Sequence, residues 1–167
     1  MRESNYLKDS IENIQKLFTI PSLNKFETKS LGRLIRQSKV RQYDNGECII
    51  REGDNDKWLY FLLDGKVRIS RKNVDIGVVS KHGEMFGEMR FLDNLSRSAS
   101  VFAVGPTTCL AVNTEVTERL PTAGEAGNFL LLLYRATAEY VSVRLRITTE
   151  ELVKVKSELE ALKKKRP

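Results

Sequence analysis

The chain has 167 residues, of which 41% are hydrophobic and 30% are charged, and its formal net charge is +6. This is the composition of an ordinary globular protein with room for one domain and one further element. No run of eighteen apolar residues occurs and the N-terminus lacks the apolar core of a signal peptide, so the sequence predicts neither a membrane span nor export. Cys48 and Cys109 are far apart and show no metal-ligand spacing, which favours reduced thiols in a cytoplasmic protein.

The first part of the chain has helical spacing. Apolar residues recur at helical intervals on either side of Pro21, at Leu7, Ile11, Ile14, Leu17 and Phe18 and then at Leu31, Leu34 and Ile35. We expect two or three short helices that pack on something larger.

From about Val40 to Asn113 the period changes to two. Short runs rich in β-branched and aromatic residues, such as "WLYFLL", "KVRIS" and "TTCLAV", alternate with turn signals such as Asn45-Gly46 and Asp64-Gly65. Many short strands at regular spacing, without βαβ alternation, predict a small antiparallel barrel, roll or sandwich.

From about Ala126 a heptad pattern begins and continues to Leu162. One series repeats every seven residues and a second follows it by three: Leu131, Ala138, Leu145, Leu152 and Leu159, then Tyr134, Val141, Thr148, Val155 and Leu162. Such a helix outruns a small barrel, so its apolar seam is predicted to pair with a second copy in a parallel homodimer. The alternative is that the whole seam packs on its own domain.

The C-terminal tail is basic. Residues 126–167 hold nine Lys or Arg against five Glu, so they contribute +4 of the net charge. A basic tail can contact nucleic acid or anionic lipid, but here the charges interleave with glutamates until the last five positions. We therefore favour a solvated helix end, and expect neither DNA nor membrane binding by this chain.

The stretch "FGEMRFLDNLSRSASV", residues 86–101, carries the candidate chemistry. Gly87 permits close backbone approach, Glu88 is an acceptor for a hydroxyl, and Arg97 is a planar cation suited to phosphate oxygens. Ser98 adds a hydroxyl and Ala99 leaves room. Together they describe a pocket for an anion that also carries hydroxyls. On spacing alone, an internal Glu88–Arg97 ion pair is an equally good interpretation.

Catalytic constellations are missing from the sequence. There is no Ser-His-Asp set, no metal-ligand cluster and no Walker-type loop, and His82 is the one histidine. We expect neither an enzyme nor a metal protein.

The quoted stretch resembles the phosphate-binding cassette of cyclic nucleotide-binding domains, in which Phe-Gly-Glu, a short helix and Arg-Ser/Thr/Ala-Ala precede a strand. The upstream stretch "YDNGECIIREGDNDKWLYFLLDGKVRIS" resembles the first strands of that family, with Gly46, Gly53 and Gly65 in the expected turns. The resemblance covers about residues 10–155 and is strongest to the bacterial catabolite activator type, without its helix-turn-helix domain.

The resemblance implies a ligand and a set of binding residues. Gly87 and Glu88 would hold the ribose 2′-hydroxyl, and Arg97 and Ser98 the cyclic phosphate. Met89, Arg90 and Ala99 would complete the cassette. On the long helix, Thr148 or Thr149 would cap the base, one of them from the neighbouring subunit. Ser98 and the threonine pair favour cAMP over cGMP.

One position departs from the family pattern. The family has Ala or Gly where this chain has Arg90, whose backbone amide would face the phosphate. A bulky side chain there could shift the turn, point outward or add a second cation. Arg90 is therefore the feature that favours the alternative function, a degenerate member of the fold that binds no nucleotide and acts as a dimerisation or docking module.

These observations combine into one prediction. The fold is α+β, an antiparallel β-roll or jelly-roll barrel (residues 1–125, with the short N-terminal helices) followed by a long C-terminal dimerisation helix with a basic tail (residues 126–167). The chain is predicted to be a cyclic nucleotide sensor in which the ligand, by touching both the cassette and the long helix, shifts the helix between two arrangements. Because it stops at Pro167, we expect either a fragment or a standalone sensor that acts on a downstream protein partner.

Overall fold

The computed structural model describes residues 1–4, 19, 23, 34, 38–115 and 123–164. The predicted N-terminal helices fall almost entirely outside these residues. Within the described part of the chain, no helix combines the length and the apolar character needed to cross a bilayer.

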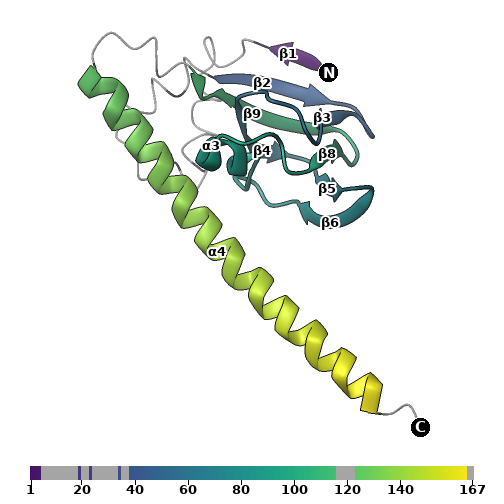
Figure 1. Cartoon of the computed structure of the whole chain (residues 1–167). Helices are drawn as coiled ribbons and strands as arrows, with labels where there is room; N and C mark the ends of the chain where they lie inside the picture. The colour runs from purple at the N-terminus through teal and green to yellow at the C-terminus, as the bar shows by residue number, and fades with distance from the viewer. Residues whose placement is uncertain (5–18, 20–22, 24–33, 35–37, 116–122, 165–167) are drawn as a thin grey trace.

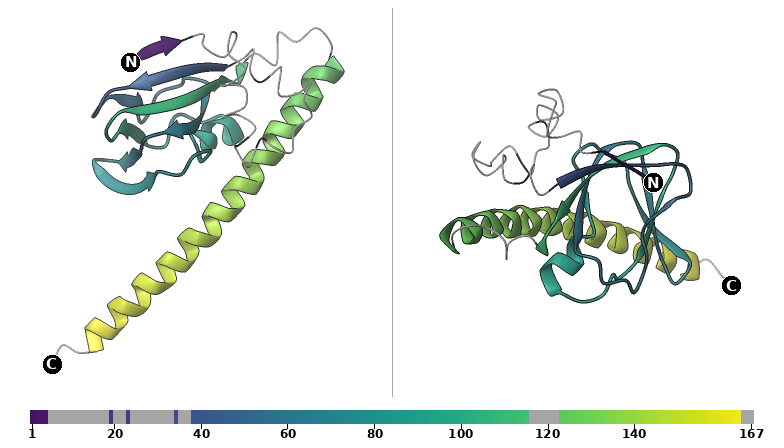
Figure 2. Two further views of the ribbon diagram at one scale, coloured as in Figure 1. Left: turned by 180° about the vertical axis from the view of Figure 1, so that it is seen from behind. Right: turned by 90° about the horizontal axis from the view of Figure 1, so that it is seen from above.

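The strands form two antiparallel sheets that curl into a roll (Figures 1 and 2). The first sheet has the order β1-β2-β9-β4-β7, made of β1 (Arg2–Ser4), β2 (Ser38–Tyr43), β9 (Thr107–Asn113), β4 (Trp58–Asp64) and β7 (Met85–Phe86). The second has the order β3-β8-β5-β6, made of β3 (Cys48–Ile50), β8 (Ser100–Ala103), β5 (Val67–Arg71) and β6 (Val74–Val79). The predicted antiparallel β-roll is confirmed. Strand β1, which pairs with β2, was not predicted.

The central strands of the first sheet are buried on both faces, which explains their unbroken apolar sequences. Successive side chains of a strand point to opposite sides. In β4, Tyr60 and Leu62 enter the core between the two sheets, whereas Leu59 and Phe61 enter a second core on the other side of the sheet. Strand β9 divides its side chains in the same way.

The second core joins the roll to the long helix α4 (Ala123–Lys164). Leu133 and Ala136 of α4 are buried there, and Tyr140 packs against the same cluster. The helix spans 42 residues, about 63 Å at 1.5 Å per residue, and projects well beyond the roll (Figure 1). The helix begins at Ala123, within three residues of the position where the sequence predicted a change of period. The predicted boundary between two domains at residue 125 stays a prediction.

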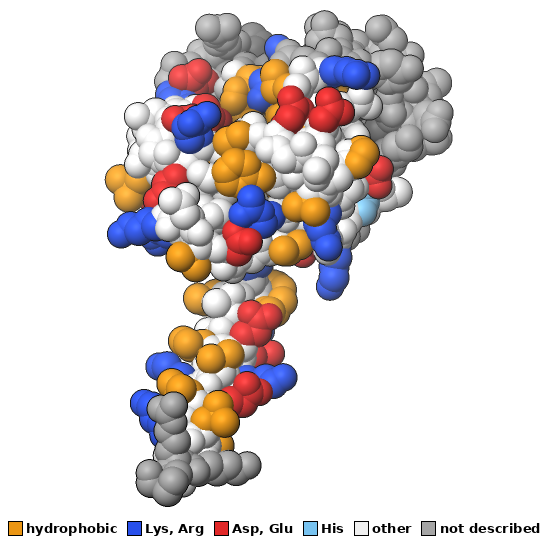
Figure 3. All heavy atoms as spheres, turned by 90° about the vertical axis from the view of Figure 1, so that its right-hand side faces the viewer, with side chains coloured by type: hydrophobic (Ala, Val, Ile, Leu, Met, Phe, Trp, Pro, Cys, Tyr) orange, Lys and Arg blue, Asp and Glu red, His pale blue; other side chains and the backbone are white. Residues whose placement is uncertain are grey.

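Beyond Tyr140, α4 carries exposed apolar side chains. Figure 3 shows them as orange groups between charged residues on the projecting part of the helix, and most belong to the predicted heptad series: Leu145, Leu152, Val155, Leu159 and Leu162. Each of these five side chains is about half exposed or more. The roll of the same chain therefore does not cover the far half of the seam.

Two turns of the roll depend on positive φ angles. At Gly65, between β4 and β5, φ is 88° and an added Cβ would lie 2.4 Å from the carbonyl oxygen of Pro106, so only glycine fits. The β5–β6 hairpin turns instead through Lys72 and Asn73, with φ of 50° and 63°. The sequence signals for turns identified the first of these and missed the second.

Replacing Leu133 by alanine tests the packing of α4 on the roll. Because the side chain is fully buried, the free energy of unfolding should fall by about 2–5 kcal/mol in urea denaturation. The control is Leu95→Ala, since the Leu95 side chain is 65% exposed and its truncation should change stability by less than about 0.5 kcal/mol. Equal small effects of both substitutions would contradict the packing described.

Candidate functional site

The candidate site is built on the segment that links β7 to β8 through the short helix α3 (Glu88–Asp93). Gly87 caps the start of α3 with φ of 78°. A Cβ added to it would lie 2.6 Å from Nη1 of Arg97 and 3.0 Å from Cδ1 of Ile50. Both the conformation and the close approach of Arg97 therefore require glycine here.

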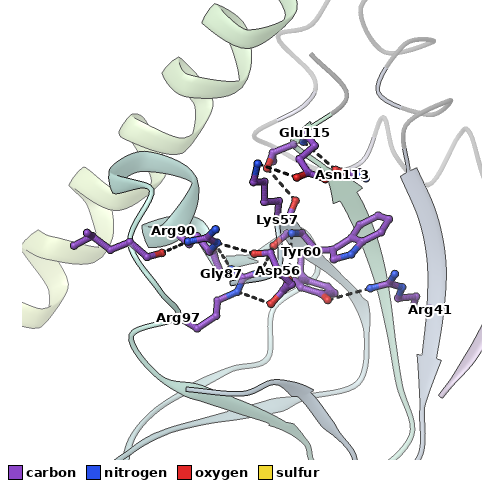
Figure 4. A network of polar contacts seen from close by, with 12 residues as sticks. Arg41, Asp56, Lys57, Tyr60, Gly87, Arg90, Arg97, Asn113 and Glu115 are labelled. Atoms are coloured by element: carbon purple, nitrogen blue, oxygen red, sulfur yellow. Dashed lines mark hydrogen bonds and ion pairs between the residues drawn. The ribbon is translucent and has the colours of Figure 1, made fainter. Parts of the chain in front are cut away.

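Arg97 is the buried charge of the site, with 4% of its surface exposed. Its Nε and Nη2 donate to the two carboxylate oxygens of Asp56, at 3.0 and 2.6 Å, and Nη1 donates to the carbonyl oxygen of Gly87 at 2.7 Å (Figure 4). Nη2 also donates to the carbonyl oxygen of Trp58. The bidentate partner of Arg97 is therefore Asp56, and not Glu88 as the alternative interpretation of the sequence had it.

Asp56 is a functional candidate that the sequence did not reveal. It lies just before β4 in a loop with several polar residues, and nothing in their spacing distinguishes it from Asp54. Burial of the Asp56 carboxylate raises its pKa, but the hydrogen bonds and charge of Arg97 outweigh burial and hold the pKa below its ordinary value. Asp56 is thus ionised at neutral pH and fixes the orientation of the Arg97 guanidinium.

Arg90, the departure from the family pattern, is turned toward backbone carbonyl groups. Its Nε donates to the carbonyl oxygen of Asp56 at 2.9 Å, and its Nη1 donates to the carbonyl oxygens of Asn94 and Leu95 (Figure 4). These bonds tie the end of α3 to the segment before β4. Both arginines therefore bind Asp56: Arg90 contacts its main-chain carbonyl group and Arg97 contacts its carboxylate.

A second group of aromatic and basic side chains lies beside the ion pair, around Trp58. The buried Arg41 donates from Nη1 to the hydroxyl of Tyr60 at 3.1 Å, and its guanidinium lies 4.0 Å from the ring centroid of Trp58. Tyr60 in turn stacks on Phe86 with 5.1 Å between ring centroids. Trp58 thus contacts Arg41 through its ring and Arg97 through its carbonyl group.

Next to this cassette lies a cavity of about 180 Å³. Seven of the nine predicted site residues line it: Gly87, Glu88, Met89, Arg90, Arg97, Ser98 and Ala99. Its remaining walls are apolar except for one residue of α4, and comprise Ile50, Ile69, Ile76, Phe86, Val101 and Arg144. The cavity therefore combines cationic and hydroxyl side chains with apolar walls, which suits a ligand that has both an anionic and an apolar part.

The two predicted base-capping residues do not line this cavity. Thr148 and Thr149 are exposed on α4, and the hydroxyl of Thr149 donates to the carbonyl oxygen of Leu145 at 2.7 Å. A role for them from a neighbouring subunit stays a prediction. The α4 residue at the cavity is Arg144, which lies one turn before Thr148 on the same face of the helix and which sequence reasoning missed.

Glu88 has the raised pKa expected of a carboxyl group at a partly closed site. Burial raises its pKa, opposed by a hydrogen bond with its own main chain and by the charges of Arg144 and Arg97. The guanidinium of Arg144 donates from Nη1 to the hydroxyl of Tyr140 at 3.2 Å. Its pKa is raised despite burial, by that hydrogen bond and by the charges of Tyr140, Glu88 and Glu84.

A larger cavity, of about 320 Å³, lies on the other side of α3 and shares Gly87, Arg90 and Arg97 with the first. It holds the ion pair between Lys57 and Glu115, whose Nζ and Oε1 atoms are 2.8 Å apart. Glu88, Ser98 and Ala99 do not line it. The smaller cavity is therefore the better candidate, because the acceptor for a hydroxyl and the cation for an anion meet there.

Comparison with known proteins agrees with this geometry. Residues 40–122 match the family model described as the cyclic nucleotide-binding domain. The chain is 33% identical over 96 residues to a cGMP-dependent protein kinase of Eimeria tenella, and 32% identical over 109 residues to a cAMP-dependent protein kinase type II regulatory subunit of Drosophila melanogaster. These matches cover 58% and 62% of this chain but only 9% and 29% of the two relatives.

Two solved structures share the fold. A cyclic nucleotide-binding domain from Methylobacillus flagellatus has a TM-score of 0.70 at 19% identity, over 85% of this chain and 83% of that one. The catabolite activator protein of Thermus thermophilus has a TM-score of 0.54 at 25% identity, over 89% of this chain and 63% of that one. The family match to residues 40–122, the shared roll and the cassette geometry agree, and the chain belongs to the family of cyclic nucleotide-binding domains.

Proposed function

We propose that this chain is a regulatory sensor that binds a 3′,5′-cyclic purine nucleotide in the cavity beside α3 and transmits the binding through α4. The proposal depends on one observation: Arg97, Glu88 and Ser98 line the same cavity as Arg144 of α4. A ligand in that cavity would touch the cassette and the long helix at once. Differential contact in two arrangements of the helix would then shift their populations.

The phosphate would meet Arg97 at a defined atom. A guanidinium has five N–H donors, and four of those on Arg97 are already engaged by Asp56, Gly87 and the carbonyl group of Trp58. The fifth donor is on Nη1, the atom that lies against Gly87 at the cavity. Asp56 thus holds the side chain in place while one N–H and the positive charge serve the ligand.

The relatives support the binding of a cyclic nucleotide, but they do not decide between cAMP and cGMP. One is named as a cGMP-dependent kinase and another as a cAMP-dependent regulatory subunit. A kinase or another signalling protein is therefore the kind of downstream partner we propose. The choice of cAMP that the sequence favoured depended on Ser98 and on the threonine pair, and neither threonine lines the cavity.

A second candidate function has one specific observation in its favour. Arg97 is largely engaged inside the protein, and Arg90 occupies the family's small-residue position with a side chain bonded to the loop. A degenerate domain that binds no nucleotide and serves as a dimerisation or docking module would tolerate both. Absence of heat in calorimetry with either cAMP or cGMP at hundreds of micromolar would select this function.

Arg97→Ala should weaken nucleotide binding at least tenfold in calorimetry with cAMP and cGMP, because a charged hydrogen bond contributes about 1.5–3 kcal/mol. Arg97→Lys, which keeps the charge but loses the planar fork, should also bind more weakly than the wild type. The control is Arg71→Ala, an exposed arginine on β5 that does not line the cavity. Unchanged affinity in folded Arg97 variants would mean that the phosphate lies elsewhere.

As the pH is lowered, the affinity for nucleotide should begin to fall at a higher pH than it would if Glu88 had the pKa of an ordinary glutamate. Burial raises the pKa of Glu88 above its ordinary value, and the ionised carboxylate is the better acceptor for the ribose hydroxyl. Affinity is therefore highest above that raised pKa and is lost as the pH falls through it. Glu88→Gln should bind more weakly at neutral pH and lose this dependence, and parallel pH profiles for the two proteins would contradict the assignment.

We also propose that α4 pairs with α4 of a second copy through its exposed heptad seam. Leu152→Lys should convert a dimer to a monomer in sedimentation equilibrium, because it places a charge in the seam. Val153→Lys is the matched control, since Val153 is a neighbouring apolar residue of similar exposure that lies outside the two heptad series. A monomeric wild type, or equal effects of the two substitutions, would refute the seam.

A further inference from the structure

Arg90 makes contacts that no small residue at its position could make. We propose that Arg90 is a positioning residue, which holds α3 and the Arg97–Asp56 pair in the binding arrangement before any ligand is present. This inference rests on the proposed function, because it concerns how the site for the nucleotide is kept in shape.

The Arg90 side chain joins two segments that are distant in the sequence. Its Nε donates to the carbonyl oxygen of Asp56 at 2.9 Å, and its Nη1 donates to the carbonyl oxygens of Asn94 and Leu95 (Figure 4). All of these acceptors are main-chain atoms, so the guanidinium fixes the path of the backbone on both sides. One planar fork thus connects the loop before β4 to the C-terminal end of α3.

Helix α3 depends on such contacts because it is short. It has six residues, and none of them is buried. A helix of this length is not stable by itself, and the carbonyl groups at its C-terminal end lack partners within the helix. Arg90 provides donors and a positive charge at that end, where a cation is favoured. Phe91 holds α3 to the long helix, since its ring stacks on that of Tyr134 with 4.5 Å between centroids.

The bond to Asp56 links this anchor to the charge of the site. The Asp56 carboxylate accepts from Nε and Nη2 of Arg97, at 3.0 and 2.6 Å. Releasing the main chain of Asp56 would therefore also loosen the orientation of the Arg97 guanidinium. When only a fraction of the molecules has the binding arrangement, the apparent affinity falls by that fraction. Arg90 is expected to keep this fraction close to one.

A direct contact with the ligand is the alternative role, because Arg90 also lines the smaller cavity and would add a second cation there. Lysine separates the two roles. Arg90→Lys keeps the charge, but a single ammonium group cannot bridge the two segments as the planar fork does. A positioning role therefore predicts that lysine does not rescue binding.

Hydrogen exchange of the nucleotide-free chain tests the anchor. In Arg90→Ala, the amides of residues 88–95 should exchange about tenfold faster than in the wild type, because charged hydrogen bonds are lost. The amides of β4 and β9 should exchange as in the wild type, since the effect is local. The control is Arg71→Ala, an exposed arginine on β5 that lines neither cavity. Unchanged exchange of residues 88–95 in Arg90→Ala, or equal acceleration throughout the roll, would overturn the inference.

Calorimetry with cAMP and cGMP tests the consequence for binding. Arg90→Ala and Arg90→Lys should both bind roughly tenfold more weakly than the wild type. Saturating nucleotide should slow the exchange of residues 88–95 more in Arg90→Ala than in the wild type, because the ligand then orders a segment that Arg90 no longer holds. Wild-type affinity in either variant would overturn the positioning role, and in Arg90→Lys it would assign Arg90 an electrostatic one.

These measurements separate the inference from the proposed function. Binding of nucleotide by the wild type with unchanged exchange in Arg90→Ala would overturn the role of Arg90 and leave the sensor intact. Binding of neither nucleotide by the wild type would overturn the proposed function, whereas exchange in the nucleotide-free chain would still decide whether Arg90 anchors α3.

Discussion

The bidentate pair between Arg97 and Asp56 is the interaction on which the site depends. It places a permanent charge at 4% exposure beside the cavity, where an unpaired guanidinium would be costly. The same pair connects two parts of the chain 41 residues apart, the loop before β4 and the segment after α3. Arg90 strengthens that connection through the Asp56 carbonyl group. The cassette is thus held in shape by residues of the protein before any ligand is considered.

The pair also leaves part of the Arg97 guanidinium available to an anion. Asp56 neutralises most of the charge of Arg97 and takes two of its donors, but leaves Nη1 facing Gly87 with one N–H available. The absence of a Cβ at Gly87 lets the guanidinium approach the backbone. Arg144 brings α4 to the same cavity. A ligand in this cavity would therefore contact both the cassette and the long helix.

Sequence reasoning predicted the features that depend on local patterns. The alternation of residues from Val40 to Asn113 predicted the strands, and the order of Gly87, Glu88 and Arg97 predicted the cassette. It missed Asp56 and Arg144, because each acts through a contact between segments distant in the chain, and a loop aspartate or a helical arginine has no distinctive local signal. It missed β1 because three residues are too few to show a period. The choice between Glu88 and Asp56 as the partner of Arg97 needed the fold.

A crystal structure of the chain with bound cyclic nucleotide tests the central claim most directly. We predict a phosphate oxygen within hydrogen-bond distance of Nη1 of Arg97, with the Asp56 carboxylate still paired to Nε and Nη2 of the same side chain. A cavity that stays empty in excess nucleotide, or a nucleotide whose phosphate lies away from Arg97, would contradict it.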